Sequence, residues 1–439
     1  MKLTLRTEHD ADIARLAVPA LGTLVAGPLY VLADTAIVGH LGSAELAGLA
    51  LATTVILSIH GLLIFLAYGT TSSVSRLIGA GDEKRAALLS IQGLWLAGIL
   101  GVVLAAAVIT QGEQLLRWLG GTGSALEFGE RYLLISALGL PFLLLALAGA
   151  GAFHGRQDAR TPLLVAVATA VINLVIELVA VFALGYGVGA SALSTVIAEV
   201  VAAGVYGWRV VGWGRKYDLS LRPVWSLILG LARAGKPLIL RNVALRGSFT
   251  LATAVAARIG VAELGGHQIG LQVWSTLALA LDAVAIAGQA LTGRWLGAGA
   301  VETARSAAAR MIQIDVSVGV LMGVLVIASR HYVAQGFSTD AEVIAAAAWV
   351  LLWVGLSEPI NGYVFALDGI LIGAGDYTYL SYSMALAGVG FAVMAGTVLA
   401  LGLGLGWLWA ALSAFMVSRA TGLWWRWRSD VWLRPGAPL

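Results

Sequence analysis

Cysteine is absent from the 439 residues, and charged side chains make up only 12% of them. The absence of cysteine excludes disulfides, thiolate metal sites and a cysteine nucleophile. The charged fraction is far below the roughly one quarter that is usual in soluble proteins. Hydrophobic residues make up 59% of the chain, which is more apolar surface than a soluble protein of this length could bury. The composition therefore predicts a protein solvated by lipid.

Motifs of enzymes and of nucleotide-driven pumps are also missing. Neither the HExxH pattern of zinc hydrolases nor the GxSxG pattern of serine hydrolases occurs. The segment Gly79-Ala80-Gly81-Asp82 lacks the lysine and the hydroxyl residue of a phosphate-binding loop. We therefore expect no enzyme, no metal site and no cofactor, and any pump activity would have to draw on an ion gradient. The basic residues lie in short loops, so we expect no nucleic-acid partner.

What the chain does contain is a long internal repeat. Residues 19–162 recur as residues 237–380 at a fixed offset of 218, without an insertion. The matched pairs include Pro19 with Pro237, Glu45 with Glu263, Arg76 with Arg294, Pro141 with Pro359 and Asp158 with Asp376. Two copies of one apolar unit are the usual construction of a membrane transporter.

Apolar stretches long enough to cross a bilayer occur twelve times, six in each copy. We expect them at 13–38, 47–75, 88–112, 130–150, 162–184, 190–212, 233–258, 266–292, 304–330, 343–368, 378–402 and 406–425. The sequence thus predicts an all-α polytopic membrane protein with twelve transmembrane helices in two pseudo-symmetric six-helix bundles. The expected bundles are residues 1–212 and 233–439, joined by a cytoplasmic linker at 213–232.

Lysine and arginine predict the orientation. In the loops and at the ends of the apolar stretches, one side of the membrane holds only Arg117, Arg131, Arg258 and Arg330. The positive-inside rule places the other side, with both termini, in the cytoplasm. An even number of spans per copy points both halves the same way, which predicts two parallel bundles with a cleft between them. We expect a monomer in the plasma (inner) membrane whose partners are the lipid bilayer and small organic substrates.

A polar layer is expected in the first copy only. Helix directions place Asp34, Asn173 and Glu177 in the outer leaflet. Asn173 and Glu177 are four residues apart and therefore share one helix face. The expected set is Asp34, Tyr132, Asn173, Glu177 and Thr195, and the second copy has Ala252, Phe391 and Ala395 in place of Asp34, Asn173 and Glu177. Two carboxyl groups close together in low dielectric are expected to share a proton. The other interpretation is that both only pack against hydrogen-bonding neighbours.

The second copy carries its own polar residues inside apolar stretches: Arg241, Arg246, Asp282 and Gln289. A buried arginine needs a carboxylate partner, and Asp282 is expected at a depth similar to that of Arg246. These residues have two possible roles, a structural ion pair or a contact with substrate. Further carboxylates expected at membrane depth, each without an evident partner, are Glu199, Asp315 and Glu358.

Pro19 and Pro28 lie within the first expected span. Proline removes a backbone hydrogen bond and bends a helix. A static kink is one interpretation. The other is that Pro19 is a hinge at which the span changes its bend when Asp34 gains a proton.

At these residues the chain resembles the multidrug and toxic compound extrusion (MATE) family, in its DinF-like branch, over essentially the whole length. The segments that carry the resemblance are Pro19, Asp34 with Val38-Gly39-His40-Leu41-Gly42, Gly155-Arg156-Gln157-Asp158-Ala159-Arg160-Thr161-Pro162 leading to Asn173, His267-Gln268-Ile269 and Leu281-Asp282-Ala283-Val284-Ala285-Ile286-Ala287-Gly288-Gln289-Ala290. The resemblance implies two six-helix bundles, alternating access and export coupled to inward flow of protons or sodium. It also implies a cation site at Asp34, Tyr132, Asn173, Glu177 and Thr195, where aspartate is the usual residue at the position of Glu177.

The leading interpretation is a secondary active multidrug efflux transporter that exports amphipathic, often cationic compounds. Two carboxylates beside one monovalent cation would leave residual negative charge in low dielectric, which favours protons over sodium as the coupling ion. Export of an organic acid such as citrate is an alternative, favoured if Arg241 or Arg246 faces the cleft and weakened if it pairs with Asp282. A lipid-precursor flippase is a further alternative, which would need a more basic cleft.

Overall fold

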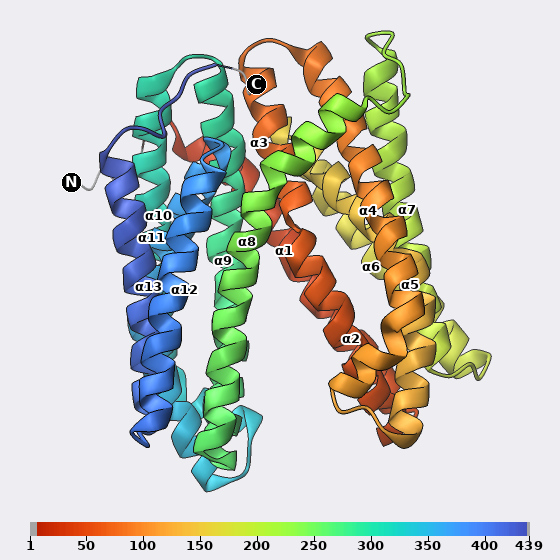
Figure 1. The fold of residues 1–439 in the computed structure, drawn as a ribbon, viewed down its shortest axis with the longest axis vertical. Helices are drawn as coiled ribbons and strands as arrows, with labels where there is room; N and C mark the ends of the chain where they lie inside the picture. The colour runs from red at the N-terminus through yellow and green to blue at the C-terminus, as the bar shows by residue number, and fades with distance from the viewer. Residues whose placement is uncertain (1–6, 437–439) are drawn as a thin grey trace. The chain divides into compact units, whose positions relative to one another are not determined.

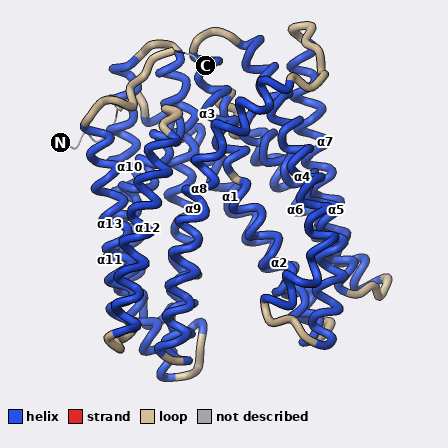
Figure 2. Tube along the Cα trace, viewed as in Figure 1, coloured by secondary structure: helices blue, strands red, loops and turns tan. Residues whose placement is uncertain are grey.

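The described part of the chain consists of helices and the loops that join them. The computed structural model describes residues 7–436, and Figure 1 shows their helices and connecting loops. Figure 2 shows no strand among these residues. Ten stretches of helix in the described part are long and apolar enough to cross a membrane. The predicted all-α membrane fold is confirmed.

The first repeat forms the helices up to residue 215. They are α1 (Asp10–Gly39), α2 (Ser43–Leu63), α3 (Phe65–Gly79), α4 (Glu83–Trp118), α5 (Gly123–Gly155), α6 (Arg160–Leu178), the π-helical turn η1 (Val179–Ala183) and α7 (Val188–Arg215). The expected span at 47–75 is two helices, α2 and α3, which meet at Ile64.

The second repeat forms six long helices. They are α8 (Trp225–Ile259), α9 (Val261–Gly297), α10 (Val301–Phe337), α11 (Ala341–Gly373), α12 (Tyr377–Ala400) and α13 (Leu405–Arg428). Of these, α8 and α13 are outside the ten candidate spans, and both contain buried arginine side chains. The connection between α7 and α8 is shorter than the predicted linker at both ends.

Equivalent glycine turns precede α4 and α10. Gly81 and Gly299 have φ values of 78° and 74°, in the left-handed region that favours glycine. In the first copy Asp82 then caps α4, because its Oδ1 atom accepts a hydrogen bond from the backbone N–H of Arg85 at 2.9 Å. The backbone of this turn therefore explains why the same glycines occur in both copies.

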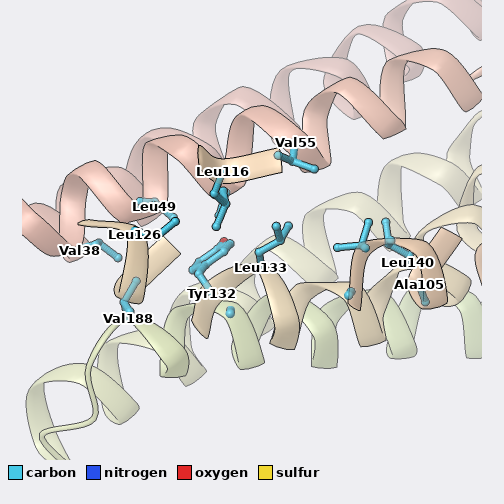
Figure 3. Packing of buried hydrophobic residues seen from close by; sticks show 14 residues of the cluster. Val38, Leu49, Val55, Ala105, Leu116, Leu126, Tyr132, Leu133, Leu140 and Val188 are labelled. Atoms are coloured by element: carbon cyan, nitrogen blue, oxygen red, sulfur yellow. The ribbon is translucent and has the colours of Figure 1, made fainter. Parts of the chain in front are cut away.

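A hydrophobic cluster holds the first-repeat helices together (Figure 3). Its fully buried members come from α1, α2, α4, α5 and α7: Val38, Leu49, Ala52, Val55, Ala105, Val108, Leu116, Leu126, Tyr132, Leu133, Ala137, Leu140, Val188 and Ala192. Gly48 of α2 lies directly against the backbone of Gly129 in α5, which a larger side chain would prevent. This close packing fixes α1 and α7, two of the helices that carry the polar residues described below.

The described residues divide into two units, and the division differs from the expected bundles in two segments. The first unit contains residues 18–235, and the second unit contains residues 7–17 and 236–436. The boundaries therefore fall inside α1 and α8 rather than in a loop. Both lie at equivalent positions of the two repeats, because one residue separates each boundary from a proline, Pro19 or Pro237.

Specific contacts explain why residues 7–17 belong to the second unit and why the α7–α8 connection belongs to the first. Asp10, at the start of α1, accepts hydrogen bonds from Arg310 at 2.7 and 2.9 Å, and His9 contacts the Ser306 hydroxyl at 2.9 Å. These contacts hold residues 7–17 on α10. At the other boundary, Gln92 and Trp95 of α4 donate to backbone carbonyls of the α7–α8 connection at 3.1 and 2.8 Å, respectively. These contacts hold the connection on the first unit.

Candidate functional site

Three helices of the first unit bring the expected polar cluster together. Asp34 lies on α1, Asn173 and Glu177 lie on α6, and Thr195 lies on α7. Asp34 is 3% exposed, Asn173 2% and Glu177 0%. Polar groups buried to this extent require hydrogen-bond partners or a neutral charge state.

Asp34 is held by a residue that the sequence did not single out. The Ser191 hydroxyl on α7 donates a hydrogen bond to the Asp34 Oδ1 atom. Ser191, Ser194 and Thr195 occupy positions i, i+3 and i+4, so they share one face of α7. This spacing is the signal by which Ser191 and Ser194 could have been predicted.

Asn173 extends the same network to α7. Its Nδ2 atom donates to the hydroxyls of Ser194 at 3.1 Å and Thr195 at 3.3 Å. Tyr30 of α1, one turn before Asp34, places its hydroxyl 2.7 Å from the Thr195 hydroxyl. The network thus joins α1, α6 and α7 through hydroxyl and amide groups.

Glu177 differs from Asp34 in its hydrogen bonding. Within residues 7–436, neither carboxylate oxygen of Glu177 has a hydrogen-bond partner. The charged group that acts on Glu177 is Asp34. A fully buried carboxylate beside a second carboxylate, without a donor of its own, is in a setting that disfavours its ionised form.

Tyr132 lies at the edge of this cluster. It is 5% exposed and packs near Leu116, Leu126 and Leu133 in the hydrophobic cluster of the first repeat (Figure 3). Asp34 is the charged residue that acts most strongly on its phenol group. Tyr132 therefore belongs to the hydrophobic cluster and also lies within the field of Asp34.

The second repeat contains a different charged centre from the one expected. Arg241 of α8 and Arg419 of α13 each donate to the Oδ2 atom of Asp368 on α11, both at 2.6 Å. All three side chains are buried, at 7%, 3% and 6% exposure for Arg241, Arg419 and Asp368, respectively. Sequence reasoning missed Asp368 and Arg419, because no local pattern links residues on three separate helices.

The other expected residues of this repeat occupy nearby positions. Asp282 on α9 is half-buried and lies in the field of Arg241 and Asp368. Gln289 is buried where the backbone of α9 meets Gly373 of α11. The pairing of Arg246 with Asp282 stays a prediction. Within residues 7–436, no group of three or more His, Cys, Asp or Glu residues is arranged to hold a metal ion.

The repeated apolar helices and the buried polar network of one repeat define a polytopic membrane protein of the transporter class. The MatE family model matches residues 19–179 and 237–398, which begin where the two repeats identified in the sequence begin and extend beyond their ends. The chain therefore belongs to the MatE family of membrane transporters, as the resemblance predicted.

Individual relatives agree with this assignment. The chain is 33% identical to Protein DETOXIFICATION 44, chloroplastic, of Arabidopsis thaliana, over 94% of this chain and 81% of the relative. It is 30% identical to DNA damage-inducible protein F of Escherichia coli, over 97% and 94%. A solved structure described as the outward-facing conformation of a multidrug resistance MATE family transporter has a TM-score of 0.87 at 23% identity, covering 98% of this chain and 97% of that one.

Proposed function

We propose that this protein is a proton-coupled multidrug efflux transporter of the plasma (inner) membrane, with both termini in the cytoplasm. It exports amphipathic, often cationic organic compounds by alternating access and acts as a monomer. The observation that carries the proposal is the buried Asp34–Ser191–Asn173–Glu177 cluster in the first repeat. Because the equivalent positions of the second repeat are apolar, this cluster is not required by the shared scaffold.

The hydrogen bonds favour protons as the coupling ion. Asp34 receives a donor from Ser191, whereas Glu177 has no donor among the described residues. A proton held between the two carboxyl groups would supply the missing donor and remove one negative charge from low dielectric. In this mechanism Asp34 and Glu177 bind the proton, and Asn173, Thr195 and Tyr132 position them. Pro19 then allows α1 to bend with protonation.

Export of an organic acid is the second candidate, since the second repeat contains buried arginines. The ion pairs of Arg241 and Arg419 with Asp368 weaken this alternative, because they already neutralise part of the positive charge. A cationic substrate agrees better with a protein in which buried carboxylate oxygens of Glu177, Asp315 and Glu358 have no hydrogen-bond partner among the described residues.

The test is efflux from proteoliposomes across a panel of cationic dyes and organic acids. With a proton gradient and no sodium, we expect uphill transport of cationic dyes accompanied by proton movement in the opposite direction. With an imposed sodium gradient and the proton gradient collapsed by an ionophore, we expect none. Sustained uphill transport in the second condition would show that the coupling ion is sodium. Transport of citrate but not of dyes would favour the organic-acid alternative.

A further inference from the structure

Two helices of the second repeat pack with their backbones in direct contact. Gly319 of α10 lies against the carbonyl of Glu358 on α11, and Gly362 of α11 lies against the carbonyl of Asp315 on α10. These two contacts fix the register of the antiparallel pair, since residue numbers rise on one helix as they fall on the other. Asp315 therefore lies one helical turn from Glu358 along the same interface.

Acidic and amide oxygens are concentrated at this interface. Asp315, Glu358 and Asn361 are 0%, 1% and 0% exposed. The Asn361 Nδ2 atom donates to Glu358 Oε1 at 2.9 Å. For residues 7–436, both oxygens of Asp315, the Oε2 atom of Glu358 and the Oδ1 atom of Asn361 have no hydrogen-bond partner. Four acceptor atoms are thus buried without a donor, which is costly for any ionised carboxylate.

The neighbouring charged groups do not offset the cost of burying these carboxylates. The charged groups that act on Asp315 are Asp282 of α9 and Glu358 of α11, both acidic. The arginines of α8 and α13, Arg241 and Arg419, are bound to Asp368. The remaining titratable group of α9 in this region is His267, which contacts the Trp409 ring of α13.

The first repeat shows that the scaffold does not need these polar residues. Its equivalent interface has Ala97, Leu140 and Leu143 at the positions of Asp315, Glu358 and Asn361. Gly101 packs against Pro141 there, just as Gly319 packs against the Glu358-Pro359 segment. The same helix pair is therefore built with apolar side chains in one copy and with two carboxyls and an amide in the other.

A small cavity reaches the cluster from one side. It has a volume of about 20 Å³ and is lined by Asn361, Ser357, Ser413 and Trp409 together with apolar residues of the same unit. The hydroxyls of Ser357 and Ser413 lie 2.9 Å apart, and the Trp409 Nε1 atom has no partner in the described part of the chain. The cavity lies beside Asn361 and is lined mostly by apolar side chains, so it supplies no donor for the buried carboxyl groups.

We propose that Asp315, Glu358 and Asn361 form a second proton-binding site, located in the second repeat. A proton on either carboxyl group supplies a donor for an acceptor that otherwise has none. It also leaves at most one negative charge in the cluster. A bare proton needs no space, whereas a sodium ion would have to enter between helices whose backbones already touch. The site does not depend on which compound is transported.

Infrared spectroscopy of the purified full-length protein tests this directly. At neutral pH and without sodium, we expect a carbonyl stretching band of a protonated carboxylic acid that shifts in heavy water. Part of the band intensity is lost in Asp315→Asn or in Glu358→Gln. This part is retained in Asp34→Asn, which removes only the contribution of the proposed Asp34–Glu177 pair. Equal band intensity in the wild type and in the Asp315→Asn/Glu358→Gln double variant would overturn the proposal. Replacement of the acid band by carboxylate bands on adding sodium chloride would also overturn it, in favour of a sodium site.

A variant with the side chains of the first repeat controls for misfolding. The Asp315→Ala/Glu358→Leu/Asn361→Leu triple variant carries the side chains with which the first repeat builds the same interface. We expect it to fold, to melt no lower than the wild type, and to lack the part of the acid band that this site contributes. Because the spectra need no transport, failure of the efflux proposal would leave this result standing.

Discussion

The Ser191 hydroxyl on α7 donates a hydrogen bond to Asp34 on α1 in the buried interior of the first unit. The contact ties α1, which contains two prolines, to a helix that shares the hydrophobic cluster of this repeat. A change in the charge of Asp34 would therefore change a contact between two helices as well as a local hydrogen bond.

We predict that Asp34→Asn reduces proton-driven efflux to the background level and leaves folding intact. Asparagine keeps the oxygen that accepts from Ser191 but cannot bind and release a proton. The measurement is dye efflux from proteoliposomes under a pH gradient, with size-exclusion profiles as the check on folding. Asp12→Asn, at an exposed position of the same helix, is the matched control and should transport normally. Unchanged efflux in Asp34→Asn would remove this residue from the coupling mechanism.

The Arg241–Asp368–Arg419 centre predicts a strong effect on stability. Asp368→Asn removes the carboxylate that both buried guanidinium groups bind, which should cost about 3–5 kcal/mol. Adding Arg419→Gln to this variant should recover part of the loss, because only one uncompensated charge then remains. Melting temperatures in detergent measure both effects.

The exposed pair of Glu113 and Arg117 is the control for the ion-pair measurement. Arg117→Gln should cost no more than about 1 kcal/mol, the usual worth of a surface ion pair. If Asp368→Asn and Arg117→Gln lowered the melting temperature equally, the buried centre would not have the stabilising role inferred from its burial.

The attachment of residues 7–17 to α10 gives a further prediction. Arg310→Gln removes a partly exposed ion pair with Asp10 worth about 1 kcal/mol. Amide hydrogen exchange in the first turns of α1 should then become several-fold faster, while exchange in residues 18–39 stays unchanged. Arg305 lies on the same helix as Arg310 and forms a more exposed pair with Asp430. Arg305→Gln should leave both rates as they are. Equal protection of residues 7–17 in Arg310→Gln and the wild type would contradict the role of this pair.

Features repeated or patterned along the chain could be predicted, and contacts between distant segments could not. The fixed offset of the repeat and the apolar stretches were enough to predict the helical membrane fold. Arg241 and Asp368 are 127 positions apart, so no spacing rule connects them. Likewise, chain order assigned residues 7–17 to the first bundle, whereas the Asp10–Arg310 ion pair holds them to the second unit. Asp315 and Glu358 looked isolated because the glycine contacts that bring them together lie on different helices.

The last prediction concerns Glu177, for which stability and transport should change in different directions. Its carboxylate is fully buried and, within the described residues, has no hydrogen-bond donor. Glu177→Gln replaces it with a neutral amide that can donate to neighbouring oxygens, so the melting temperature should stay the same or rise. Proton-coupled efflux should be lost, because glutamine cannot exchange a proton, whereas Glu177→Asp should keep the coupling at a lower rate. Glu113→Gln, on the exposed surface of α4, should change neither property. A Glu177→Gln protein that melts lower and still transports normally would mean that Glu177 is a packing residue and that Asp34 couples the ion alone.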